Sequence, residues 1–170
     1  MPVISQAERK AANLEGKHDA LALLTADHKE VAQLFKSYEA LVSADAEDDE
    51  KEALADQICA MLIVHATIEE EIFYPAAREN LDMEDLLDEA QVEHATARDL
   101  ISQIQDMESN EDLFDAKVKV LGEYIEHHVR EEEDELFPKV RRTKLDLQAV
   151  GHELAARKQQ LLSRASTKVT

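Results

Sequence analysis

Two segments of the chain carry a histidine and a glutamate four residues apart. The segment HATIEEEIFYP begins at His65 and contains Glu69, and the segment HVREEEDELFP begins at His128 and contains Glu132. The segments match at the histidine, at the acidic residues from the fifth position, and at the final proline. Residues four apart share one face of a helix, so each pair presents an imidazole and a carboxylate together. If buried, such pairs need a cation, because an uncompensated carboxylate in a protein core carries a large desolvation cost.

Two further histidines stand alone in apolar stripes. His28 follows Asp27 in DHKEVAQLF, and His94 follows Glu93 in the similar segment EHATARDLI. Each half of the chain therefore contains a lone histidine and then a His-x-x-x-Glu pair. The four histidines lie at similar distances from the intervening loops, so antiparallel helices would place them at a similar depth. The predicted metal-binding residues are His28, His65, Glu69, His94, His128 and Glu132.

The chemistry of these six donors indicates a pair of metal ions. Four imidazoles and two carboxylates exceed the four ligands of one tetrahedral zinc ion. The two-fold repeat predicts two equivalent metals, each held by two histidines and bridged by Glu69 and Glu132. Mixed nitrogen and oxygen donors inside a helical bundle suit non-haem iron, so we expect two iron ions with an oxo or hydroxo bridge. Manganese and zinc remain alternatives.

Four amphipathic segments can position these residues. Apolar residues recur at spacings of three and four over residues 18–43, 50–78, 83–108 and 111–141, with short polar loops between them. The chain has three Gly, three Pro and no Trp, which favours long helices over a sheet. We therefore predict an all-α protein, an up-down-up-down four-helix bundle, because short loops make neighbouring helices antiparallel.

The 170-residue chain has the length of one domain. The bundle is expected to span residues 18–141. Residues 1–17 lack a clear apolar face and are predicted to form a mobile N-terminal arm. Residues 142–170 are predicted to form an appended C-terminal helix and tail outside the bundle.

The charge and hydrophobicity of the chain argue against nucleic-acid and membrane partners. The net charge is −19. It would repel a phosphate backbone, so no nucleic-acid partner is expected. No apolar run approaches the ~20 residues of a membrane helix, and the N-terminus lacks the apolar block of a secretion signal. We therefore expect a soluble, cytoplasmic protein without a membrane partner. Cys59, the one cysteine, lies at an apolar helix position and is expected to be a buried free thiol.

The pattern H, H-x-x-x-E, H, H-x-x-x-E, with its Phe-Tyr-Pro and Leu-Phe-Pro endings, resembles the hemerythrin HHE cation-binding family over about residues 18–141. The resemblance implies that the four histidines are terminal ligands and that Glu69 and Glu132 bridge two irons. Oxygen-carrying hemerythrins have a fifth histidine four residues after the one in the third helix, where this chain has Arg98. Reversible oxygen carriage is therefore not expected, and oxygen should convert the reduced centre to a diferric one.

The resemblance also implies a class of function. We expect a non-haem diiron protein that reacts with or senses dioxygen, peroxide or nitric oxide, with peroxide decomposition or oxidase-type activity left open. The alternative is an iron-sensing or iron-holding module without catalytic turnover. A bundle without metal would leave the buried carboxylates unexplained.

Several residues near the motifs have two interpretations. His127 and Glu131 repeat the spacing of His128 and Glu132, but periodicity favours His128 as the inward residue and His127 as a residue that is solvated or supports a ligand. Glu135, one turn beyond Glu132, is a further candidate ligand.

The remaining polar and aromatic neighbours are expected to have ordinary roles. Asp27 and Glu93 are expected to face solvent, with a role in orienting neighbouring groups as the alternative. The tyrosines, Tyr38, Tyr74 and Tyr124, are expected to pack with exposed hydroxyls, with a role beside the metals as the alternative. Pro75 and Pro138 are expected to kink or end their helices just past the site.

Overall fold

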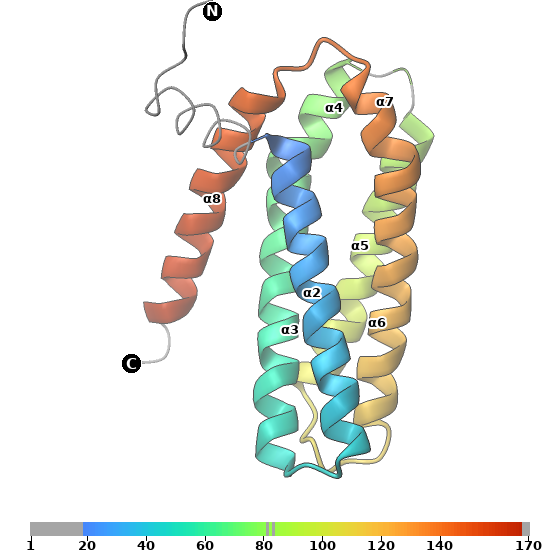
Figure 1. Cartoon of the computed structure of the whole chain (residues 1–170), viewed down its shortest axis with the longest axis vertical. Helices are drawn as coiled ribbons and strands as arrows, with labels where there is room; N and C mark the ends of the chain where they lie inside the picture. Colours follow the sequence, from blue (N-terminus) through green and yellow to red (C-terminus); the bar gives the residue numbers. More distant parts are fainter. Residues whose placement is uncertain (1–18, 81, 83, 168–170) are drawn as a thin grey trace, which may run out of the picture.

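The computed structural model describes residues 19–80, 82 and 84–167, and in this part of the chain all regular structure is helical. The bundle is built from α2 (Ala20–Ser43), α3 (Asp48–Ile68), α5 (Glu84–Gln105) and α6 (Phe114–Glu131). These four helices run alternately up and down around a common core (Figure 1). The predicted all-α four-helix bundle is confirmed, and the predicted arm at residues 1–17 lies outside the described residues.

The second and fourth long segments continue beyond α3 and α6 without a break. After α3 come η1 (Glu69–Phe73) and α4 (Tyr74–Asn80), and after α6 come η2 (Glu132–Leu136) and α7 (Phe137–Arg141). Of the two predicted effects of Pro75 and Pro138, a kink or a helix end, the end is wrong, because α4 and α7 continue past the prolines. Each proline lies in a helical turn that follows one turn of wider π-helix.

The π-helical turns change the direction of the side chains that follow them. The N–H of Tyr74 donates to the carbonyl of Glu69, and the N–H of Phe137 donates to that of Glu132, five residues back in each case. One extra residue is thus accommodated per turn, just before a proline that has no N–H of its own to donate. Residues five apart, such as Glu69 and Tyr74, then share a face.

Helix ends follow local chemistry. The side chain of Asp19 accepts from the N–H groups of Leu21 and Ala22 at 2.9 and 3.1 Å and caps α2. The predicted start of the fourth helix at residue 111 is three residues early, because Leu113 adopts a left-handed conformation with φ of 76° and α6 begins at Phe114.

The core is divided into two apolar layers with the four histidines between them. Along α2, for example, Leu24 lies in one layer, His28 follows, and Val31 lies in the other. The same order occurs on α5, and the antiparallel segments α3 and α6–η2 cross the layers in the opposite order. Cys59 is buried and free in the second layer, as expected. The packing therefore isolates one polar layer within an otherwise apolar bundle.

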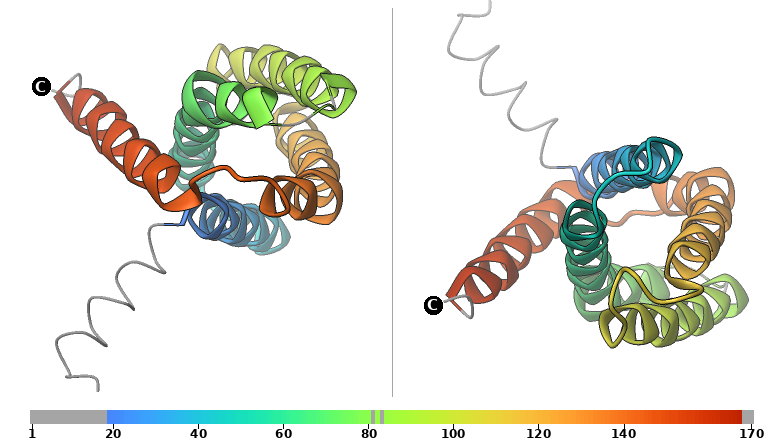
Figure 2. Two further views of the ribbon diagram at one scale, coloured as in Figure 1. Left: turned by 90° about the horizontal axis from the view of Figure 1, so that it is seen from above. Right: turned by 90° about the horizontal axis from the view of Figure 1, so that it is seen from below.

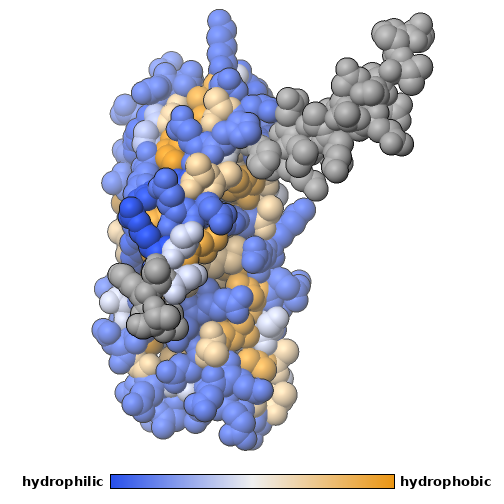
Figure 3. All heavy atoms as spheres, turned by 90° about the vertical axis from the view of Figure 1, so that its left-hand side faces the viewer, coloured by the Kyte–Doolittle hydropathy of each residue, from blue (hydrophilic) through white to orange (hydrophobic). Residues whose placement is uncertain are grey.

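The additional C-terminal helix, α8 (Leu147–Thr167), packs outside the bundle against α2 and α3 (Figure 2). Its Val150 and Leu154 are buried against the layer that contains Leu24. Figure 3 shows this side of the molecule, where hydrophobic groups lie scattered among hydrophilic residues. In the described part of the chain, no helix has the length and apolar character needed to cross a membrane.

Candidate metal centre

The structure brings all six predicted donors into one buried cluster. Their ligand atoms form two overlapping groups, within each of which every atom lies within 4.8 Å of the others. One group comprises His28, His65, Glu69 and Glu132, and the other comprises Glu69, His94, His128 and Glu132. All six residues are buried. Two carboxylates are thus shared between two pairs of histidines.

The imidazoles of each pair converge through their Nε2 atoms. His28 Nε2 lies 3.2 Å from His65 Nε2, and His94 Nε2 lies 3.2 Å from His128 Nε2. Two ligands on adjacent corners of one metal lie roughly 3 Å apart when each bond is about 2.1 Å. The observed spacing therefore suits two nitrogen ligands of a common ion in each half.

The shared carboxylates lie between the histidine pairs. Glu69 Oε1 is 2.6 Å from His65 Nε2, and Glu69 Oε2 is 3.1 Å from His94 Nε2, so one carboxylate spans both halves. Glu132 Oε1 lies 2.5 Å from His128 Nε2. Glu69 Oε1 and Glu132 Oε2 are buried without a hydrogen bond of good geometry to any described residue. Such oxygens are rare in folded proteins and fit a cation-binding role.

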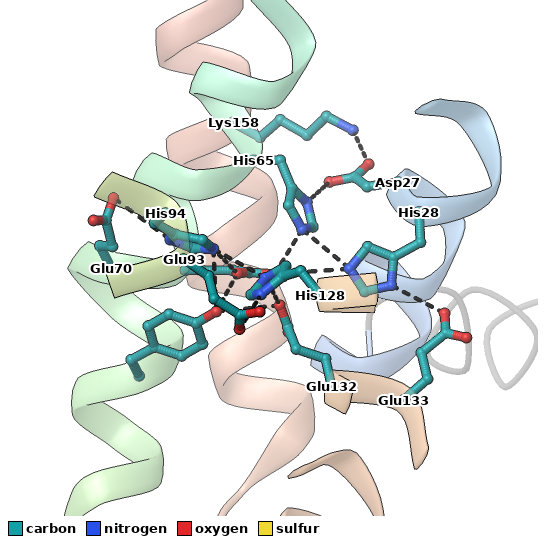
Figure 4. A network of polar contacts seen from close by, with 12 residues as sticks. Asp27, His28, His65, Glu70, Glu93, His94, His128, Glu132, Glu133 and Lys158 are labelled. Carbon is teal, nitrogen blue, oxygen red and sulfur yellow. Dashed lines mark hydrogen bonds and ion pairs between the residues drawn. The ribbon is translucent and has the colours of Figure 1, made fainter. Parts of the chain in front are cut away.

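In three of these four histidines, a carboxylate lies within hydrogen-bond distance of Nδ1, the ring nitrogen that points away from the cluster (Figure 4). The partner atoms of the histidine Nδ1 atoms are Glu133 Oε1 at 2.9 Å from His28, Asp27 Oδ2 at 3.0 Å from His65, and Glu93 Oε1 at 3.0 Å from His128. A carboxylate in this position fixes the ring and directs Nε2 toward a metal. The expectation that Asp27 and Glu93 face solvent is wrong, because each turns toward a neighbouring helix.

His94 is held differently. Its buried Nδ1 makes no hydrogen bond within the described part of the chain, and the nearest carboxylate oxygen, Glu70 Oε2, is 3.9 Å away. Glu70 instead pairs with Arg98 at 2.6 Å. The guanidinium of Arg98 is thus engaged by Glu70. It does not take the place of the fifth histidine of the oxygen carriers.

Tyr74 is an additional member of the cluster. Its hydroxyl donates to Glu69 Oε2 at 2.7 Å or Glu132 Oε1 at 3.1 Å and lies 3.2 Å from His94 Nε2. The expectation of an exposed hydroxyl is wrong for Tyr74. It is also wrong for Tyr38, which is buried and donates to Asp115 at 2.7 Å. In the sequence, Tyr74 stands five residues after Glu69. Because a π-helical turn lies between them, the two side chains share one face of the helix.

Buried charge shifts the protonation of the cluster. Burial alone would lower the pKa of His65, but the charge and hydrogen bond of Glu69 and the hydrogen bond of Asp27 raise it to about 10. For His128, Glu132 and Glu93 overcome burial in the same way and raise the pKa to about 11. Protons on the imidazoles thus compensate the buried carboxylates, and a bound metal would displace them.

A small apolar cavity adjoins the histidines. Its volume is about 30 Å³, and it is lined by the four histidines and by aliphatic side chains such as Val31 and Ile125, with Arg98 at its wall. A cavity of this size holds one water-sized or diatomic molecule.

The remaining candidates lie outside the cluster. His127 is 63% exposed at its side chain, whereas His128 is buried, so the structure places them as the periodicity predicted. Glu135 is exposed, and the structure does not bring it to the cluster.

The bundle, the histidine pairs and the shared carboxylates define a helical metal-binding protein. Residues 19–140 match the model of the hemerythrin HHE cation-binding domain, and the chain belongs to this family. The crystal structure of a hemerythrin HHE cation-binding domain-containing protein from Mycobacterium kansasii is similar, with a TM-score of 0.73 and 25% sequence identity. The alignment covers 89% of this chain and 91% of that one. Comparison with curated proteins finds no match.

Proposed function

We propose that this chain is a non-haem diiron protein that reacts with or senses dioxygen, peroxide or nitric oxide. The observation that carries the proposal is the overlap of the two donor groups in Glu69 and Glu132. Each half then offers two imidazoles and shares two carboxylates, which is a mixed nitrogen and oxygen set suited to iron. When bound, two irons supply one-electron redox chemistry that none of these side chains has.

The residues around the centre would control access and protonation. The apolar cavity beside the four histidines has room for one small molecule. Burial, and the charges of Glu132 and Glu69, raise the pKa of Tyr74 well above its ordinary value, so its phenol stays neutral as a proton donor. Arg98 remains paired with Glu70, which leaves the fifth histidine of the oxygen carriers without a substitute. We therefore propose irreversible reaction with oxygen and not reversible carriage.

Anaerobic iron loading tests the proposal. Purified protein would be loaded with ferrous iron, washed with a weak chelator and analysed for metal, and spectra would be recorded after oxygen, peroxide and nitric oxide in turn. We expect about two iron ions per chain and a spectral change with at least one of these molecules. A stoichiometry near one would contradict the dinuclear centre. Recovery of the reduced spectrum after argon purging, over repeated oxygen cycles, would restore oxygen carriage.

A second candidate is an iron-sensing or iron-holding module without turnover. It is favoured by one contact: Lys158 of α8 lies 2.5 Å from Asp27 Oδ1, and Asp27 in turn accepts from His65. Metal occupancy is thereby connected to a helix outside the bundle. Stoichiometric binding of two irons, without peroxide decomposition and with a change in protection of α8 from hydrogen exchange, would favour this alternative.

A further inference from the structure

The supporting carboxylate of the first half lies between a histidine and a positive charge. Asp27 Oδ2 accepts from His65 Nδ1 at 3.0 Å, and Asp27 Oδ1 lies 2.5 Å from the ammonium of Lys158 (Figure 4). This lysine comes from α8, which covers α2 and α3. Each oxygen of the buried carboxylate therefore has its own partner, and the ammonium compensates its charge.

In the second half, the equivalent carboxylate is Glu93. Its Oε1 accepts from His128 Nδ1 at 3.0 Å, just as Asp27 accepts from His65. Its Oε2 lies 4.0 Å from His127 Nε2, and His127 Nε2 lies 3.1 Å from Glu131 Oε1. The helix α8 lies on the other side of the bundle from α5 and α6 (Figures 1 and 2). Where the first half has an ammonium, the second half has an imidazole and a second carboxylate.

The internal repeat shows which residues of the first half correspond to His127 and Glu131. With His65 aligned to His128, the residues that correspond to His127 and Glu131 are Val64 and Ile68. Val64 is 8% exposed and Ile68 is fully buried, in the apolar layer that includes residues of α8. The same two helix positions are thus apolar in the first half, whereas in the second half they carry an imidazole and a carboxylate. Glu131 and His127 are 33% and 63% exposed at their side chains.

The three donors have a geometry that one ion can bridge. One ligand atom each from Glu93, His127 and Glu131 lies within 4.8 Å of the other two. Ligands about 2.1 Å from one ion lie roughly 3 Å apart on adjacent corners and about 4 Å apart on opposite ones. The observed spacings of 3.1 and 4.0 Å span this range. One imidazole and two carboxylates suit a divalent transition metal such as zinc or ferrous iron, with water as the remaining ligands.

We propose that Glu93, His127 and Glu131 form an outer site for a divalent transition-metal cation, which takes the place that the Lys158 ammonium has in the first half. A cation there gives Glu93 a partner at each oxygen, as Asp27 already has. The outer site does not depend on which metal occupies the buried centre, because Glu93 reaches that centre only through His128.

Zinc binding to the iron-loaded protein tests this site. After the chelator wash, the wild-type protein would be dialysed against a series of zinc concentrations, and both metals would be measured in each sample. We expect about one zinc ion per chain beyond the wild-type iron content. In the variants His127→Ala and Glu131→Gln, zinc affinity should fall roughly tenfold or more, with iron content unchanged. His152→Ala, which removes an exposed histidine on α8, serves as the matched control and should bind zinc as the wild type does.

Zinc binding of equal affinity in the wild type and in both outer-site variants would overturn the proposal and leave His127 and Glu131 as an exposed ion pair only. An equal loss in the His152→Ala control would also overturn it, because the binding would then be unspecific. A chain that holds no iron would contradict the proposed function, yet the zinc difference between wild type and variants would still test the outer site.

Discussion

The two halves of the centre have the same ligand pattern and different surroundings. In the first half, Asp27 is buried and its charge is compensated by Lys158, and the ring of Phe137 stacks on His28 at a centroid distance of 5.9 Å. In the second half, Glu93 is nearer to solvent, and the position equivalent to Phe137 is Tyr74, which contacts His94. The repeat therefore places the same donor residue types in both halves, whereas the groups that contact those donors differ, and the prediction of two equivalent metal positions stays a prediction.

The cause of this difference is an element outside the repeat. Within the described residues α8 has no counterpart against the second half, and it packs against the first half, where it supplies Lys158 and shares an apolar layer with Ile68. A two-fold sequence repeat thus yields a centre whose halves differ in charge compensation. The supporting groups can make the two metal positions differ in affinity, because such groups tune ligand basicity.

The largest loss of iron binding is expected from a change at Glu69, which contacts the histidines of both halves. Glu69→Gln should reduce iron binding in both halves together, because the carboxylate of Glu69 contacts both histidine pairs. We expect a loss beyond the roughly 10- to 100-fold that removal of a supporting group costs. Metal analysis after gel filtration measures it, with Glu135→Gln as a control at an exposed position. Retention of one tightly bound iron would show that Glu69 serves one half only.

A smaller and unequal effect is expected from the supporting carboxylates. Asp27→Asn and Glu93→Gln should each weaken iron binding by roughly 10- to 100-fold, because each removes the anion behind a histidine ligand. The loss should be greater for Asp27→Asn, since that change also leaves the half-buried ammonium of Lys158 without its anionic partner. Competition with a chelator of known affinity would measure both. Equal losses would show that Lys158 does not distinguish the halves.

The stability of the metal-free protein should depend on pH in a defined direction. The folded pKa values of His65 and His128, about 10 and 11, lie above the unfolded value of 6.5. The folded state therefore binds more protons between these limits, and its stability should be full below pH 6.5 and decrease as pH rises toward 10. Thermal unfolding of chelator-treated protein from pH 6 to 9 measures this. A melting temperature that stays constant or rises over this range would contradict the raised pKa values of His65 and His128.

The smallest effect, a change in melting temperature, is expected from exchanging the equivalent aromatic residues Tyr74 and Phe137. Tyr74→Phe makes the second half resemble the first and removes a hydroxyl that donates to a buried carboxylate. An unsatisfied buried acceptor costs about 1–3 kcal/mol, so the melting temperature of the metal-free protein should fall by several degrees. Phe137→Tyr is the matched substitution in the other half. If Tyr74→Phe leaves the melting temperature unchanged, the hydroxyl does not stabilise the carboxylates.

Much of the centre can be predicted from local pattern. Spacings of three and four identify each helix and its inward face, and the repeated His-x-x-x-Glu selects residues that one turn of helix must place together. This is why His65 with Glu69, and His128 with Glu132, could be found without a structure. Periodicity also separated His128 from His127, because a shift of one residue turns a side chain by about 100° around the helix.

The groups that support the donors were decided by tertiary structure. Asp27 and Glu93 precede inward histidines, and periodicity alone places them toward solvent. Their actual partners come from neighbouring helices, and Lys158 lies 131 residues from Asp27 in sequence. Tyr74 reaches the cluster because a π-helical turn shifts its direction after Glu69. A sequence pattern describes the faces of each helix separately, whereas the packing and register of several helices determine which side chains meet across them.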